Sequence, residues 1–272
     1  MNKDFDKDNM ANGASSSGQS FWEHLDVLRS VLLKIFVAVC VLMIIAFCFK
    51  EPLFQIVLAP KDPNFIFHHL LGGEEFHVDI INTKLASQFT MHVKVACYAG
   101  VLLASPYIIY QLFTFISPAL YVSERRYAVW ATLWGYLLFM IGVLLNYFII
   151  FPLTFRFLST YQVSSDVINT ITLTSYIETL MTLCLVMGLV FEMPLLSWFL
   201  SRIGVLSSNF MRKYRRHAIV VVLMLAAIIT PTSDIFTLMA VSLPIYMLYE
   251  ASIFIVQISE VRILKQSKCA DI

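Results

Sequence analysis

Long apolar runs separated by short charged segments most limit what this chain can fold into. Residues 30–49, 85–116, 128–151 and 173–200 each hold at most two charged side chains. A transmembrane helix needs about 20 predominantly apolar residues, and every run reaches that length. Only 14% of all residues are charged, whereas soluble domains usually carry about 25%. We therefore expect an all-α membrane protein with several spans.

The last apolar region is harder to interpret, because Pro231, Thr232, Ser233 and Asp234 divide residues 218–258. Residues 218–230 would make a helix of only about 20 Å, whereas the hydrocarbon core is about 30 Å thick. The region is either a re-entrant hairpin or two short spans in a locally thinned bilayer. Two spans agree better with the distribution of charge. The sequence thus predicts six transmembrane helices, with the last two short.

Lys and Arg residues gather on one side of this six-span topology. Thirteen of the nineteen lie in the N-terminal segment, the second and fourth loops and the C-terminal segment, and four lie in the other loops. Basic residues are enriched on the cytoplasmic side of membrane proteins. Both termini are therefore expected in the cytoplasm.

The polar segments define the expected domain organisation. Residues 1–20 are polar and rich in Gly and Ser, which predicts a disordered cytoplasmic tail. Residues 21–258 form the membrane domain, with an exported loop at 50–84, and residues 259–272 form a cytoplasmic tail. Residues 21–29 have the pattern of an amphipathic helix along the membrane surface, ending in Arg29, three residues after Asp26.

Nothing in the sequence indicates catalysis, a metal site or a cofactor. The chain has no GxSxG, HExxH or P-loop motif. Its five cysteines are scattered without metal-ligand spacing, and no cysteine accompanies the histidines of the exported loop. We therefore expect a protein that is not an enzyme.

Glu192 is the strongest candidate for an intramembrane functional residue. It lies in the motif FEMP, with apolar sequence on both sides, and Pro194 follows two residues later. A carboxyl group inside a membrane needs a partner, water or protonation, and it usually marks a functional site. A structural hydrogen bond to a neighbouring helix is the alternative. Gln111 and Thr230 are weaker candidates, since polar residues often only join helices.

A second group of acids lies on the predicted cytoplasmic side. Glu124 is followed directly by Arg125 and Arg126, and Glu23 and Asp26 precede the first span. Each acid alone has an ordinary explanation as part of a membrane anchor, a helix cap or a local ion pair. Together, three carboxylates would suit a ligand with consecutive arginines, because guanidinium binds carboxylate through two parallel hydrogen bonds.

The motifs FWEHLDVLR, SPALYVSERR, FEMP and TPTSD together resemble the TatC family over about residues 20–258. TatC is the multispanning subunit of the Sec-independent, or twin-arginine, protein translocase. The resemblance implies six helices in a concave arrangement in the bacterial cytoplasmic membrane, without enzymatic activity. It also implies recognition of twin-arginine signal peptides, export of folded proteins by the proton-motive force, and TatA/TatB-type single-span partners. Several copies would assemble among membrane lipids, without nucleic acid.

The resemblance also assigns roles to individual residues. The expected signal-peptide site comprises Glu124, Glu23, Asp26, Arg125, Arg126, Phe115 and Pro118. The expected intramembrane and partner contacts are Glu192, Gln111, Thr230 and Asp234, and Pro60 and Arg29 are expected to be structural.

Two positions depart from the family pattern. Val27 stands where the family's EHLxELR motif has its second acid, which shifts arginine binding toward Glu124. Leu238 replaces a polar docking residue of some members and leaves Thr230 as the remaining candidate. A small proton-coupled transporter that uses Glu192 is the alternative function, although the sequence has no convincing internal repeat.

Overall fold

The computed structural model describes residues 5–62, 80–116, 125–161, 170–230 and 234–270. The described helices are α1 (Phe5–Cys48), α2 (Lys50–Leu58), η1 (Ala59–Lys61), α4 (Ser87–Ile116), α5 (Arg125–Leu145), η4 (Asn146–Ile150), α6 (Phe151–Thr160), α7 (Leu173–Val190), α8 (Met193–Arg202), α9 (Ser208–Lys213), α10 (Arg215–Ile229) and α11 (Ile235–Ala270). The short strands β1 (Ile80–Ile81) and β2 (Ile171–Thr172) pair in parallel.

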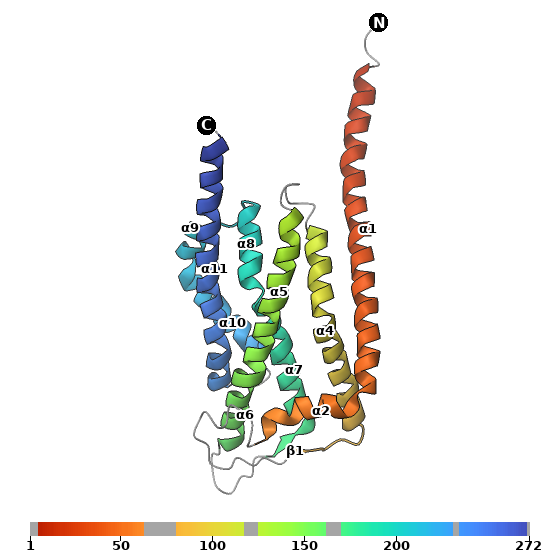
Figure 1. Ribbon diagram of the computed structural model, residues 1–272, viewed down its shortest axis with the longest axis vertical. Coiled ribbons are helices and arrows are strands. Elements are labelled where there is room, and N and C mark those ends of the chain that lie inside the picture. Colours follow the sequence, from red (N-terminus) through yellow and green to blue (C-terminus); the bar gives the residue numbers. More distant parts are fainter. Residues whose placement is uncertain (1–4, 63–79, 117–124, 162–169, 231–233, 271–272) are drawn as a thin grey trace.

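The long helices stand side by side, and α1 starts at the same end of the molecule where α11 finishes (Figure 1). Among the described residues, five stretches have the length and composition to cross a membrane. They are Leu25–Cys48, Ser87–Phe115, Trp130–Thr160, Leu173–Arg202 and Ile235–Val261. The predicted all-α class is confirmed, and α10, with 15 residues, is the short helix predicted before the last span.

The prediction that the last helix is also short is wrong. α11 has 36 residues, and its apolar part alone, Ile235–Val261, has 27. Pro244 lies inside α11 without ending it, and the segment contains no glycine. The helix also continues beyond residue 258 into the segment expected to be a polar tail, because that segment is rich in good helix formers.

The N-terminal segment also differs from the prediction. α1 begins at Phe5, inside the region expected to be disordered, and continues without a break to Cys48. Residues 21–29 therefore extend the first span along its own axis and do not turn along the membrane surface. No proline interrupts α1, and once a helix has formed, each added residue contributes one further backbone hydrogen bond.

The third span is longer than predicted, because Pro152 does not end it. The π-helical turn η4 joins α5 to α6, and Pro152 occupies the first turn of α6. Proline is tolerated there, since the first N–H groups of a helix have no partner within it. Asn146 in η4 is buried and donates a 3.1 Å hydrogen bond to Cys184 Sγ of α7.

Close helix contacts build the core between α5 and α7. A Cβ atom added to Gly142 would lie 2.6 Å from the Met187 carbonyl oxygen, and one added to Gly188 would lie 2.6 Å from the Phe139 ring. Glycine at both positions lets the two helices approach closely. Phe139 and Met187 are themselves buried, so this crossing is part of the main hydrophobic core.

The short helix α2 lies across the end of the bundle opposite the termini (Figure 1). Tyr147 and Tyr176 donate hydrogen bonds to the carbonyl oxygens of Ile56 and Val57, over 2.6 and 3.1 Å. Pro60 is buried in the turn η1 that follows. The start of the loop at 50–84 is therefore fixed to the third and fourth spans.

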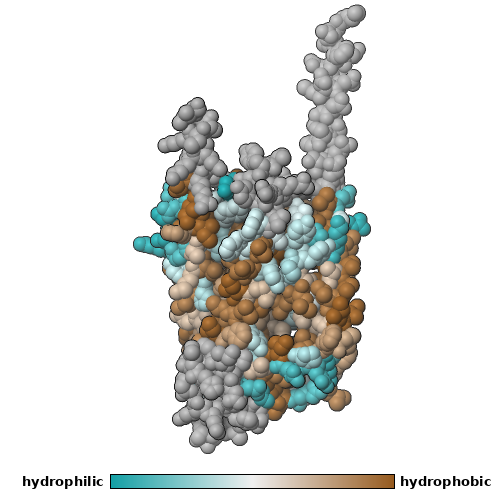
Figure 2. Space-filling model, viewed as in Figure 1, coloured by the Kyte–Doolittle hydropathy of each residue, from teal (hydrophilic) through white to brown (hydrophobic). Residues whose placement is uncertain are grey.

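On the face seen in Figure 2, hydrophobic residues form a band across the middle of the molecule, and hydrophilic residues lie toward both ends. Large apolar side chains of the candidate spans are exposed, including Phe36, Trp134, Leu144 and Phe254. Such exposure is unfavourable in water and favourable against lipid tails. The surface therefore agrees with a membrane-spanning bundle.

Candidate functional site

The predicted signal-peptide site lies only partly within the described residues. Glu124 and Pro118 fall outside them. The structure places Glu23 in α1 and Arg125 and Arg126 in the first turn of α5. Phe115 is half-buried near the end of α4. The end of α4, the start of α5 and the N-terminal half of α1 lie at the same end of the bundle (Figure 1).

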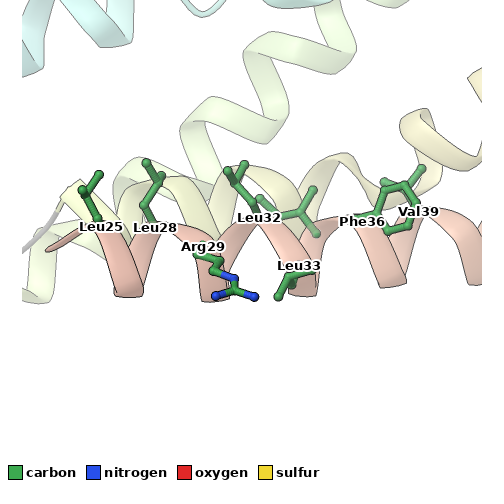
Figure 3. A pocket seen from close by; sticks show the side chains of 8 residues that line it. Leu25, Leu28, Arg29, Leu32, Leu33, Phe36 and Val39 are labelled. Carbon is green, nitrogen blue, oxygen red and sulfur yellow. The ribbon is translucent and has the colours of Figure 1, made fainter. Parts of the chain in front are cut away.

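The described part of α1 at this end carries polar and apolar side chains together. Asp26 and Arg29 are exposed and do not pair with each other. Arg29 lines a shallow groove along α1 whose other walls are mainly leucines, including Leu25, Leu28 and Leu32 (Figure 3). Val27 is 50% exposed, so it offers an apolar surface where an acid would offer a hydrogen-bond acceptor.

Glu192 lies where the fourth span is broken between α7 and α8. Pro194 in the first turn of α8 has no N–H to continue the hydrogen bonding of α7. The chain turns with hydrogen bonds from Phe191 N to Met187 O, 3.0 Å, and from Glu192 N to Leu189 O, 3.1 Å. The motif FEMP therefore both ends one helix and places a carboxyl group at the start of the next.

The Glu192 carboxyl group packs against α5 at Gly135, a position that also lies close to α4. A Cβ atom added to Gly135 of α5 would lie 3.2 Å from Glu192 Oε2, and it would lie equally close to Ile109 Cγ2 of α4. Glu192 Oε1 is buried and has no hydrogen-bond partner among the described residues. The predicted structural hydrogen bond is thus not formed at this oxygen, which favours the functional interpretation.

The other predicted intramembrane residues do not join Glu192. Gln111 donates a 2.7 Å hydrogen bond to Tyr107 Oη on its own helix. Thr230 is buried, and its hydroxyl donates to Ala226 O over 2.9 Å. Asp234 caps α11 by accepting hydrogen bonds from the Thr237 backbone N–H and hydroxyl, both 2.7 Å. These contacts give Thr230 and Asp234 local structural roles.

Sequence reasoning missed an ion pair between two spans. Lys94 Nζ of α4 lies 2.5 Å from Glu178 Oε1 of α7, and both side chains are about half exposed. The available signal was the presence of two opposite charges in apolar runs, since charges in a membrane usually pair. Their separation of 84 residues hides the pairing in the sequence.

Comparison with known proteins places the chain in a family. The family model described as "Sec-independent protein translocase protein (TatC)" matches residues 23–244. The TatC protein of a Blattabacterium from Periplaneta americana is 36% identical over 250 residues, covering 86% of this chain and 94% of its own length. The TatC protein of Escherichia coli K12 is 33% identical over 236 residues, covering 85% of each chain.

Solved structures agree with this assignment. The crystal structure of the twin-arginine translocase receptor TatC superposes with a TM-score of 0.75 at 31% identity. The match covers 87% of this chain and 99% of that receptor, which confirms the expected TatC-like arrangement of helices. Family membership also confirms that this is a multi-pass membrane protein of a transport system, not an enzyme. The chain belongs to the TatC family of Sec-independent protein translocase proteins.

Proposed function

We propose that this chain is the signal-peptide receptor and core subunit of a twin-arginine translocase. The translocase exports folded proteins across the bacterial cytoplasmic membrane, driven by the proton-motive force. The superposition with a twin-arginine translocase receptor carries this proposal, because it covers 99% of that receptor chain. The family match offers no support to the alternative, a small proton-coupled transporter.

The proposed recognition site is the group of carboxylates at Glu124, Glu23 and Asp26. Two consecutive arginines on a signal peptide would each bind a carboxylate through paired hydrogen bonds. Asp26 is exposed on α1, whose N-terminal half lies at the end of the bundle where α4 finishes and α5 begins (Figure 1), and this supports the site. Since exposed Val27 cannot accept a hydrogen bond, Glu124 carries the largest share of arginine binding.

The proposed environment has both termini in the cytoplasm. The start of α1 and the finish of α11 at one end of the bundle support an even number of crossings (Figure 1). TatA/TatB-type single-span helices are the proposed partners within the membrane, with several copies of the chain per complex. Glu192 is the proposed contact, because its buried oxygen lacks a partner among the described residues and lies near α4 and α5.

Photo-crosslinking of a twin-arginine signal peptide tests the recognition site. A photoreactive group beside the arginine pair is expected to label the chain in membranes, and Glu124→Ala is expected to remove both labelling and export. Glu51→Ala is the matched control, because Glu51 is an exposed acid of α2 at the opposite end of the bundle. Intact labelling and export in Glu124→Ala would refute the assignment of Glu124.

A further inference from the structure

The surface formed by α9 and the start of α10 combines exposed aromatic and basic side chains. Phe210 is 55% exposed and Tyr214 39% exposed, and Lys213, Arg216 and His217 are also exposed. The Phe210 and Tyr214 ring centroids are 4.6 Å apart, and those of Tyr214 and His217 are 5.4 Å apart. Lys213 Nζ lies 5.9 Å from the Tyr214 ring centroid. These five exposed residues of neighbouring helical turns are named the α9–α10 surface.

Contacts with α11 hold this surface in place. The Glu260 carboxylate accepts hydrogen bonds from the Ser208 backbone N–H, 2.9 Å, and from its hydroxyl. Tyr249 donates a 2.8 Å hydrogen bond to Met211 O, and the Met211 side chain is buried against α11. A segment that served only as a solvent-exposed connection would not require these hydrogen bonds and packing contacts with α11. The exposed side chains are therefore presented on a fixed backbone.

Charge is concentrated on the outer side of this segment. Arg215 faces α11 and pairs with Glu250 over 2.7 Å. Arg212 also faces α11, where it donates a hydrogen bond to the amide oxygen of Gln257. Lys213 and Arg216 have no acidic partner within the described part of the chain. Lys213 and Arg216 therefore leave two cations on the outer side, which favours an anionic ligand.

The α9–α10 surface lies at the level expected for lipid headgroups. Just beyond it along α10, Ile219, Val220 and Val221 are 42%, 58% and 59% exposed, as expected for lipid-facing residues. Arg216 precedes Ile219 by three residues, about 4.5 Å along the helix axis. In Figure 2 hydrophilic residues lie at the left edge, where Figure 1 shows α9, directly above the hydrophobic band. Aromatic rings with a polar edge are typical of this boundary.

We propose that the α9–α10 surface binds the phosphate headgroups of anionic phospholipids in the leaflet at the end where the termini lie. Lys213 and Arg216 contact the phosphate, and Phe210 and Tyr214 pack against the glycerol and upper acyl region. Complementary charge and lipid-facing α10 directly beside the surface identify a lipid as the ligand. This binding site is independent of signal-peptide recognition.

Native mass spectrometry of the purified full chain tests this site, with phosphatidylglycerol and phosphatidylcholine as probes. The double substitution K213Q/R216Q is expected to weaken phosphatidylglycerol binding by about 30-fold, since each basic residue near an anionic surface contributes roughly fivefold. Phosphatidylcholine binding should not change. K50Q/K61Q, with the same charge loss on α2 and η1 at the opposite end, is the matched control. Unchanged phosphatidylglycerol binding in K213Q/R216Q, or an equal loss in the control, would overturn the proposal.

Two further measurements distinguish a lipid from other anions and from a protein partner. Excess inorganic phosphate is expected to leave bound phosphatidylglycerol in place, and displacement would assign the site to free phosphate and contradict a lipid site. With p-benzoylphenylalanine at position 210 in native membranes, we expect adducts with the mass of a phospholipid. Adducts with a protein instead would reject lipid as the occupant. Because Lys213 and Arg216 are exposed, K213Q/R216Q should keep the unfolding temperature of the unmodified chain.

Discussion

At the scale of single residues, Glu192 shows how one short motif sets both backbone and chemistry. FEMP ends α7, starts α8 and places a carboxyl group against Gly135. The sequence predicted the cost of a carboxylate in apolar surroundings, but it predicted one helix over residues 173–200, which the structure divides into α7 and α8. It did not predict that the carboxyl group packs over a glycine of α5, because that contact joins residues 57 positions apart.

Glu192→Leu separates the functional from the structural interpretation of this residue. Leucine has a similar volume and no polar atoms, so it removes a buried oxygen that has no partner among the described residues. An unsatisfied buried polar group costs about 1–3 kcal/mol. We therefore expect thermal unfolding of the purified chain at an equal or higher temperature, together with a large loss of export. Normal export by a stable Glu192→Leu variant would show that the carboxyl group has no role in transport.

At the scale of elements, the sequence predicted the positions of the spans better than the ends of the helices. Apolar runs located the spans, because a bilayer imposes a minimum length. They did not locate the end of α6, because the third span continues through Pro152. They also did not locate the end of α11, which continues into polar sequence. They also did not reveal the hydrogen bonds from Tyr147 and Tyr176 to α2, since such contacts form between segments about 100 residues apart.

The short helix α10 leads to a prediction about the bilayer. Its 15 residues span about 22 Å, less than the hydrocarbon core of about 30 Å. The bilayer beside α10 is therefore expected to be thinner, and four leucines inserted after Val221 should restore its thickness and impair export. Four leucines inserted after Val261, beyond the apolar part of α11, are the control. Undiminished export by the longer α10 in an export assay would count against a role for thinning.

At the scale of the whole molecule, sequence and structure lead to the same architecture by different routes. Apolar run lengths and basic residues predicted six spans with both termini on one side. In the structure, α1 starts and α11 finishes at the same end of the bundle (Figure 1). The family motifs located the carboxylates of the proposed receptor site. Glu124 lies outside the described residues, and its proposed role is the binding of the two arginines of a signal peptide.

Binding of twin-arginine and twin-lysine signal peptides to the full chain in lipid nanodiscs tests this proposed role most directly. Lysine carries the same charge as arginine but cannot form two parallel hydrogen bonds with one carboxylate. We predict that replacing both arginines weakens binding by at least about tenfold, since each charge-assisted hydrogen bond contributes about 1.5–3 kcal/mol. We also predict that Glu124→Gln reduces this difference. Equal affinity of the unmodified chain for the two peptides would contradict its assignment as a twin-arginine receptor.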